Sequence, residues 1–484
     1  MSGAGHADET APLPSGWTSA TLGEVSTVSG GLQKSPKRAP REHTAPFLRV
    51  ANVGSGVLDL DDVHQIELTP EELQRYRLEP GDLLVVEGNG SASQIGRAAT
   101  WRGALDPCVH QNHLMRVRPT SAIMPEFLEY IWMSPAVSDD VRRRAASTSG
   151  LYVLTTKKIS GVGLSLAPLP EQERIVAAIE EAFSKLDAGE AGLRTIRRLL
   201  KRMRASVLAA AVTGRLVPQD PTDTSAAKLL ADLGTVAIER PDPMELPDGW
   251  AVTSLGAVSV LQEYGISLKA HVNPLKGDVP MLRMGNIQGG AIDPTDLKYV
   301  GSDKDGVARR LLERGDLLFN RTNSIELVGK SAVYRGTPAR STFASYLIRV
   351  RTAAGVEPEW CAAVINSQIG RRYIESVAVQ QVGQANVNGT KLKALLLPLP
   401  PSGEQRRVLA ELDRQFSFLD ACERAVDAGL VRSAALRRSV LKAAFEGKLV
   451  PQDPRDEPAS MLLKRIRAER AAAPKPALRA RRTV

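Results

Sequence analysis

Aromatic residues make up only 4% of the 484-residue chain, and its three cysteines lie far apart. An odd, scattered set of cysteines argues against a disulfide framework and against a cysteine-based zinc cluster. No unbroken apolar run is longer than six residues, the length of Val207 to Val212, far fewer than the ~20 that a membrane-spanning helix needs. The first ten residues show no basic-then-apolar secretion signal. These absences predict a cytoplasmic protein without a membrane segment.

Signals of catalysis are also missing. No Gly-x-Gly pair has the third glycine of a dinucleotide-binding loop, and Ser324 stands where a phosphate loop ending at Gly329 would need glycine. The Asn/Asp-Pro-Pro-aromatic tetrapeptide that an amino-methyltransferase needs does not occur. His110 and His113 could suggest a metal pair, but no third ligand has suitable spacing. The sequence predicts a chain that carries no catalytic site and no metal.

Positive charge is concentrated at the C-terminus. The formal net charge is +9, and residues 464–484 contain eight bases and one acid, so the rest of the chain is almost neutral. Such a tail adds sequence-independent attraction to nucleic-acid phosphates. A solubilising, frayed end explains the same composition, and the sequence leaves both interpretations open.

The chain is an internal tandem duplication. The matched segments are 13–17 with 246–250, 47–53 with 281–287, 80–84 with 314–318, 171–174 with 404–407, and 214–221 with 447–454. The register between the two copies is nearly constant along the chain, and a repeat of this length is too long for a solenoid. One domain-sized module is therefore used twice, with pseudo-two-fold symmetry.

Each module has a globular head and a long helix. In the heads, the apolar runs 83–86 and 317–319 follow turns and predict buried strands, whereas 125–132 and 357–369 predict helices. After the first head, apolar or small residues recur from Ile175 to Ala210 in steps of four and three, a heptad pattern. The predicted seam is Ile175, Ile179, Ala182, Leu186, Gly189, Leu193, Ile196, Leu200, Met203, Val207 and Ala210, and its counterpart in the second copy runs from Val408 to Ala443.

This pattern predicts an α+β fold. Two mixed α/β heads would be joined by two long, antiparallel, coiled-coil-like helices of ~36 residues each, because neither narrow seam would be stable unpaired.

The loops between strands diverge while the rest of the repeat stays aligned. Residues 87–95 face 321–328, and 148–152 face 381–385, with different polar side chains. Asn, Gln, Arg and Ser are side chains that hydrogen-bond to base edges. Ordinary drift of loop sequences would look similar, but the scarcity of acids favours two recognition surfaces for two different targets.

Several short motifs recur in the same order in both repeats, and this arrangement resembles the specificity subunit of type I restriction–modification enzymes. The motifs are Leu-Pro-x-Gly-Trp at 13–17 and 246–250, Gly-Asp-Leu-Leu at 81–84 and 315–318, the helix openings at 166–175 and 399–408, and Gly-Arg/Lys-Leu-Val-Pro-Gln-Asp-Pro at 214–221 and 447–454. In the second helix opening, Ser402 and Gly403 replace the Leu-Pro of the first. The resemblance covers nearly the whole chain.

The resemblance implies a non-catalytic subunit with two target-recognition domains, each recognising one half of a bipartite, asymmetric double-stranded DNA site. It implies as partners two methyltransferase subunits and the restriction translocase–nuclease subunits. The cofactors S-adenosylmethionine, ATP and magnesium would belong to those partners and none to this chain. The expected boundaries are target-recognition domain 1 at 1–165, spacer helix 1 at 166–217, a linker at 218–245, target-recognition domain 2 at 246–398, spacer helix 2 at 399–450 and a basic C-terminal tail at 451–484.

Two alternatives remain at this point. A self-contained methyltransferase would need the missing motifs, and a duplicated scaffold that binds only proteins would share the repeat but not bind DNA.

The candidate site residues follow from the polar loops and the nearby bases, and each could equally be an ordinary surface residue. Base contacts are predicted for Asn89, Ser91, Ser93 and Gln94 in the first head, and for Arg321, Asn323, Gln381 and Gln384 in the second. Phosphate contacts are predicted for Lys34, Lys37, Arg38, Lys157, Lys158, Lys391 and Lys393.

Overall fold

The computed structural model describes residues 12–89, 94–145, 152–239, 245–381 and 383–472. They fall into two compact units: unit 1 combines residues 1–193 with 428–484, and unit 2 is formed by residues 194–427. Within the described residues, no helix combines the length and apolar character needed to cross a membrane.

Unit 1 is built on the antiparallel four-stranded sheet β2-β9-β5-β7, beside the three-stranded sheet β4-β3-β8 and the two-stranded sheets β1-β11 and β6-β10. Its strands are β1 Thr18–Thr21, β2 Ser26–Gly30, β3 Thr44–Leu48, β4 His64–Glu67, β5 Leu83–Val86, β6 Gly88–Asn89, β7 Ala98–Thr100, β8 Val109–His110, β9 Leu114–Pro119, β10 Tyr152–Val153 and β11 Gly163–Leu166. Its helices are α1 Leu22–Val25, α2 Pro70–Tyr76, α3 Pro125–Met133, α4 Pro135–Ala145, α5 Thr156–Ser160, the first half of α6 Leu169–Val212, the end of α11 Ser402–Phe445 and α12 Ala459–Ala472.

Unit 2 repeats this plan with the sheet β13-β22-β18-β20, the sheet β17-β14-β21, the pairs β12-β25 and β15-β16, and the sheet β19-β24-β23. Its strands are β12 Ala251–Ser254, β13 Ser259–Tyr264, β14 Asp278–Leu282, β15 Ile287–Gln288, β16 Ala291–Ile292, β17 Lys298–Gly301, β18 Leu317–Asn320, β19 Thr322–Asn323, β20 Ser331–Val333, β21 Thr342–Phe343, β22 Leu347–Thr352, β23 Val379–Gln381, β24 Gln384–Asn386 and β25 Leu396–Leu399. Besides the parts of α6 and α11, its helices are α7 Ala226–Asp232, α8 Pro358–Asn366, α9 Gln368–Val377 and α10 Gly389–Lys393.

The predicted buried strands are confirmed as β5 and β18. Leu83 and Val85 face the core shared with α3, whereas Leu84 and Val86 face a second core on the other side of the sheet. A strand buried on both faces needs a continuous apolar run, because successive side chains point to opposite faces.

The helix predicted for 125–132 is confirmed as α3, but the single helix predicted for 357–369 was wrong. The structure has two helices in this segment: α8 ends at Asn366, and α9 begins at Gln368. Between them Ser367 has an extended backbone, with φ −73° and ψ 172°, and its hydroxyl donates to the carbonyl of Val364 at 2.7 Å. Serine competes for backbone hydrogen bonds in this way and ends helices.

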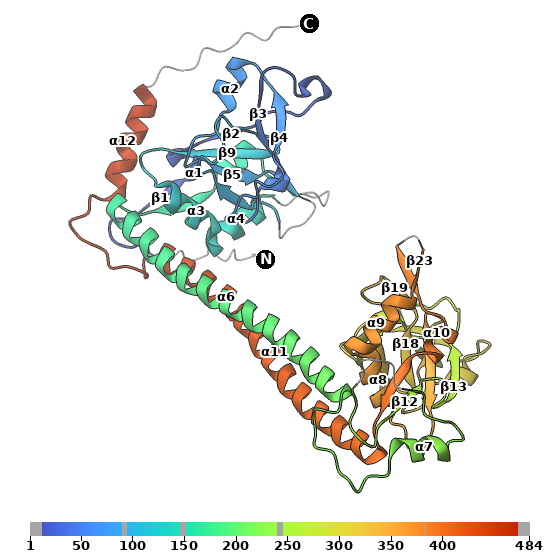
Figure 1. Ribbon diagram of the computed structural model, residues 1–484. Helices are drawn as coiled ribbons and strands as arrows, with labels where there is room; N and C mark the ends of the chain where they lie inside the picture. The colour runs from blue at the N-terminus through green and yellow to red at the C-terminus, as the bar shows by residue number, and fades with distance from the viewer. Residues whose placement is uncertain (1–11, 90–93, 146–151, 240–244, 382, 473–484) are drawn as a thin grey trace, which may run out of the picture. The chain divides into compact units, whose positions relative to one another are not determined.

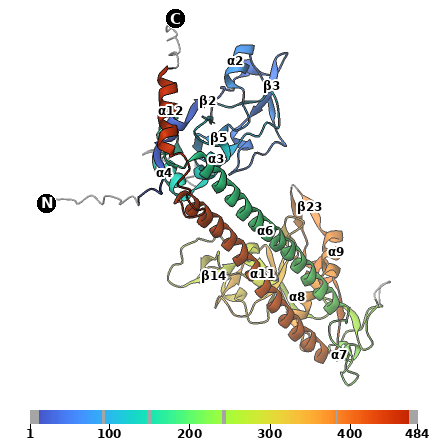
Figure 2. The same ribbon diagram turned by 90° about the vertical axis from the view of Figure 1, so that its left-hand side faces the viewer.

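The fold class is confirmed: α6 and α11 are long helices that run antiparallel. In unit 1 the beginning of α6 lies against the end of α11, and in unit 2 the end of α6 lies against the beginning of α11 (Figures 1 and 2). Each helix has 44 residues, which is longer than the sequence pattern predicted.

The residues of the predicted seam on α6 alternate between two rows, one that contains Ile179 and Leu200 and one that contains Ile196 and Met203. The second of these rows was wrong for the middle of the helix. In the first row Ile179 and Leu200 are buried and the other members are half-buried, whereas in the second row Ile175 is buried but Ile196 and Met203 are 45% and 50% exposed. The second row of the interface lies one position further along α6 and is occupied by Phe183, Glu190, Arg197, Arg204 and Ala211. Long charged side chains cover the contact with their aliphatic stems while they form ion pairs.

Two equivalent arginine clusters hold this contact. In unit 1, Arg437 pairs with Asp187 and Glu190 and lies 5.0 Å from the ring centre of Phe183. In unit 2 the residues at the equivalent positions of the repeat make the same contacts. Arg204 pairs with Asp420 and lies over Phe416 at 4.7 Å. The internal repeat of the sequence therefore extends to side-chain contacts.

Each long helix is fixed to its head by a glutamine from the recurring Glu-Gln motif. Gln172 accepts a hydrogen bond from the backbone N–H of Met124 at 2.9 Å and donates to the carbonyls of Ala122 and Ala167. Gln405 bonds the backbone N–H of Glu357 in the same way. Both glutamine side chains are fully buried, so their amides must have these partners.

The segments expected as a linker and a basic tail each contain a packed helix. In α7, Leu230 is fully buried in unit 2, and in α12, Leu463 is 2% exposed in unit 1. The N–H of Ala226 donates to Gly249, and that of Ala459 to Gly16, at 2.8 and 2.9 Å. The two helices are therefore equivalent parts of the repeat.

The described bases of α12 are mostly engaged within unit 1. Arg465 pairs with Glu457, Arg467 pairs with Glu24, and Arg470 donates to the carbonyl of Ser26 at 3.0 Å. Residues 464–472 thus belong to the head, and the idea of a frayed end from residue 464 was wrong. Residues 473–484 lie outside the described residues.

The packing of α12 gives a stability prediction. Leu463→Ala should lower the free energy of unfolding of unit 1 by about 2–4 kcal/mol, because it removes a buried side chain and leaves a cavity. Met461→Ala is the matched control: Met461 is 48% exposed on the same helix, so the expected change is within about 0.5 kcal/mol. Chemical denaturation of the full chain measures both. Equal, small effects would show that α12 is not part of the folded head.

Candidate nucleic-acid interface

In each head, the two divergent loops of the repeat meet in one small sheet. In unit 1, β6 pairs with β10, with Asn89 opposite Tyr152. In unit 2, β19 pairs with β24, with Asn323 opposite Ala385, and β24 also pairs with β23, with Gln381 opposite Gln384. Segments that are far apart in the sequence thus meet by strand pairing in each unit. We call these the small sheets; β19 and β23 of the second are labelled in Figure 1.

The small sheet of unit 2 is supported by an arginine and a tyrosine. Arg321, which directly precedes β19, has its guanidinium 4.9 Å from the ring centre of Tyr264. It also donates to the side chain of Asn386 at 3.4 Å, and Asn386 donates to Thr322 at 2.7 Å. The Tyr264 hydroxyl accepts the N–H of Gly389, the first residue of α10, at 2.7 Å. Arg321 therefore ties the small sheet to β13.

The corresponding place in unit 1 has the opposite charge. Glu87 occupies the position of Arg321, and its carboxylate lies 3.8 Å from the imidazole of His113. In unit 2 the counterpart of His113 is Tyr346, which is 50% exposed. A carboxylate accepts hydrogen bonds and a guanidinium donates them, so the two heads offer different chemistry from one fold.

The predicted base-contacting residues are only partly described. Asn323 and Gln384 lie on the small sheet of unit 2, where the Asn323 side chain accepts the N–H of Ser324 at 2.9 Å and Gln384 is exposed. Asn89 and Gln381 lie on β6 and β23. Gln94 is exposed and accepts a hydrogen bond from Arg97 at 2.9 Å. Ser91 and Ser93 lie outside the described residues.

The predicted phosphate contacts divide into engaged and exposed side chains. Arg38 forms a two-pronged pair with Glu72 at 2.7 and 2.9 Å, which lowers the pKa of Glu72 to about 2. Lys158 donates to the carbonyl of Val153, and Lys391 donates to that of Val377. Those three residues brace their own heads. Exposed ammonium groups remain at Lys34, Lys37, Lys157 and Lys393.

Sequence reasoning did not include Tyr264, Tyr346, Glu87 or His113 among the predicted contacts, and it considered His113 only as a possible metal ligand. The exchanges of Glu87 for Arg321 and of His113 for Tyr346 were visible in the alignment of the two repeats. In a chain so poor in aromatic residues, two tyrosines beside the polar loops were a further signal. Nothing local linked Tyr264 to Arg321, because several strands and loops separate them in the sequence.

Histidine and cysteine side chains of the described residues are candidate metal ligands and nucleophiles. No group of three possible metal ligands occurs among the described residues. His110 is fully buried, and burial lowers its pKa to about 3, which keeps it neutral. Burial likewise raises the pKa of Cys108 and of Cys361 to about 12, so neither thiol is a ready nucleophile.

Comparison with known proteins agrees with this architecture, although no family model matches the chain. The type I restriction enzyme EcoKI specificity subunit of Escherichia coli (strain K12) is 25% identical over 475 residues, covering 95% of this chain and 97% of that protein. The StySPI specificity subunit of Salmonella potsdam is 26% identical over 477 residues, covering 95% and 96%.

The fold also matches a solved chain from a study of complex assembly and conformational transition in the type I restriction–modification system. Its TM-score is 0.62 at 19% identity, covering 91% of this chain and all of that chain. The similarity extends over both repeats and both long helices, as the end-to-end coverage requires. Over nearly its whole length, the chain is therefore similar to type I restriction enzyme specificity subunits.

Proposed function

We propose that this chain is the DNA-specificity subunit of a type I restriction–modification complex, in which each head recognises one half of a bipartite, asymmetric site. The observation that carries the proposal is the pair of small sheets. One backbone plan presents Glu87 and His113 in unit 1, and Arg321 and Tyr346 in unit 2. Arginine donates to guanine, and a carboxylate accepts from cytosine. Because the two small sheets carry different side chains, we expect the two heads to recognise different half-sites.

The long helices would fix the separation of the two half-sites. Each is a single α-helix of 44 residues, about 66 Å at 1.5 Å per residue. The arginine clusters of Arg204 and Arg437 hold the antiparallel register within each unit. A fixed register gives a fixed gap between the recognised bases.

Catalysis would belong to the partners. Two methyltransferase subunits would supply S-adenosylmethionine and flip the target adenine out of the duplex, and restriction subunits would use ATP and magnesium for translocation and cleavage. This chain would position them on the DNA in the cytoplasm. The buried, neutral state of His110 and the two buried thiols fits a chain that binds without reacting.

The first test separates the two heads. Asn323→Ala with Gln384→Ala should relax base preference in the second half-site only, because each lost base contact costs about 1–3 kcal/mol of discrimination. Gln94→Ala is the matched variant in the first head and should affect only the first half-site. Methylation of a randomised DNA library by the complete methyltransferase complex, followed by sequencing, measures both. Relaxation of both halves by either variant, or of neither half by both, would contradict the assignment.

The second test lengthens the helices. One heptad inserted after Thr195 and one after Ala428, which are equivalent positions in the repeat, preserve the seam and add ~10 Å. The bases recognised in each half should stay the same, whereas the preferred gap should grow by about three base pairs, at ~3.4 Å per pair. Three pairs also rotate one half-site by roughly 100°, so binding should weaken as the DNA twists to compensate.

The control for this test is an insertion of four residues at each position, which breaks the heptad phase and should abolish methylation. Methylation of a library with randomised gap lengths reports the outcome. Full activity at the original gap with the heptads in place would mean that the helices do not set the spacing.

A further inference from the structure

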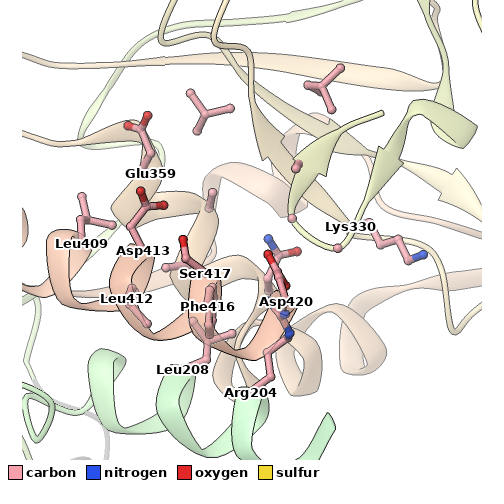
Figure 3. Close-up of a pocket in the computed structure, with 18 of the residues that line it drawn as sticks. Arg204, Leu208, Lys330, Glu359, Leu409, Leu412, Asp413, Phe416, Ser417 and Asp420 are labelled. Carbon is pink, nitrogen blue, oxygen red and sulfur yellow. Dashed lines mark hydrogen bonds and ion pairs between the residues drawn. The ribbon is translucent and has the colours of Figure 1, made fainter. Parts of the chain in front are cut away.

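A cavity of about 980 Å³ opens in unit 2 between α8 and the paired helices α6 and α11. Its base is apolar and formed by Leu208 of α6 and by Leu409, Leu412 and Phe416 of α11 (Figure 3). Cavities of this size and lining are typical of binding sites.

The first repeat shows what fills the corresponding place in unit 1. There Tyr130 of α3 packs edge-on against Phe183 of α6, with ring centres 5.8 Å apart and planes at 90°. The alignment of the two repeats matches Phe183 with Phe416, and in the same register it matches Tyr130 with Ala363. Unit 2 has therefore kept the supporting ring and lost the ring that packs on it.

Two neighbouring positions on α8 also carry smaller side chains than their counterparts on α3. Glu129 corresponds to Ala362, and Met133 corresponds to Asn366. Both Ala362 and Asn366 line the cavity. Three larger side chains of α3 are thus replaced by smaller ones on α8, which accounts for the space.

The support beneath the missing ring is intact. Arg204 lies over Phe416 at 4.7 Å, as Arg437 lies over Phe183 at 5.0 Å. Phe416 is held by the same kind of cation–π contact as Phe183, and an incoming aromatic ring would gain the edge-to-face contact that Tyr130 makes.

Carboxylates at one end of the cavity can accept hydrogen bonds from a ligand. Asp413 of α11 and Glu359 of α8 lie close together there (Figure 3); the Asp413 carboxylate also lies 3.9 Å from the guanidinium of Arg335, and its side chain is 74% exposed. In unit 1 burial raises the pKa of the Tyr130 hydroxyl to about 12, and the nearby Glu180, the counterpart of Asp413, contributes to this shift. A phenol or an indole N–H can donate a hydrogen bond to either carboxylate.

We propose that this cavity is a docking site for a partner protein, which inserts a tyrosine or tryptophan side chain against Phe416 with its donor toward Asp413 and Glu359. The cavity is larger than one ring, so residues next to the aromatic one enter as well. This inference does not rest on DNA recognition, because it uses only the face of unit 2 formed by α8 and the paired helices.

Two reciprocal variants test the proposal in the full-length chain. Ala363→Tyr places the first repeat's own residue in the cavity and should reduce binding of the probe N-acetyl-tyrosinamide at least tenfold. Tyr130→Ala opens the equivalent place in unit 1 and should add a second site of similar affinity. Saturation-transfer NMR titrations measure the binding, with N-acetyl-leucinamide as the non-aromatic comparator and thermal unfolding as the check on folding.

The expected order is one site in the parent chain, none in Ala363→Tyr and two in Tyr130→Ala, with the leucine probe binding at least tenfold more weakly. Absence of saturable binding of the tyrosine probe to the parent chain would overturn the proposal. So would unchanged binding in folded Ala363→Tyr, or equal binding of the leucine probe.

Discussion

The completion of each head's core by segments from both repeats is the constraint on which the rest of the structure depends. The core of unit 1 includes Leu441, Leu463 and Ile466 from the C-terminal end of the chain, and Phe127 of the first head packs edge-on against Phe445 at 5.2 Å. Unit 2 in turn takes Val212 and Leu230 from the end of the first repeat. Each core thus contains apolar side chains from both repeats, which brings the beginning of one long helix against the end of the other within each unit.

Much of this fold could be predicted from the sequence, because each sequence pattern that indicates a structural element occurs in both repeats. The duplication, the strands β5 and β18 and the long helices followed from apolar patterns that recur in register. The second seam row could not be predicted, since Ala182 and Gly189 look apolar enough for a seam while the true row holds Glu190 and Arg204. Only the facing helix shows that these charges have partners. The basic composition of α12 likewise concealed Leu463 and Ile466.

The sequence predicted which loops form the candidate site, but it did not predict the side-chain contacts within it. Divergence between the repeats identified both loops of each small sheet, and the structure brings them together by strand pairing. The partnership of Arg321 with Tyr264 depends on the position of β13 at the edge of the four-stranded sheet, for which no local pattern exists. The same comparison between repeats that locates the unlike surfaces also explains the cavity beside Phe416. Differences between two copies of one fold indicate where the two units do different things.

Methylation mapping of DNA treated with the complete methyltransferase complex tests the central claim most directly, because it reports which bases this chain selects. The account predicts a single bipartite motif with two unlike halves and one fixed gap between them. A continuous motif, two identical halves, or halves that tolerate many gap lengths with equal efficiency would contradict it.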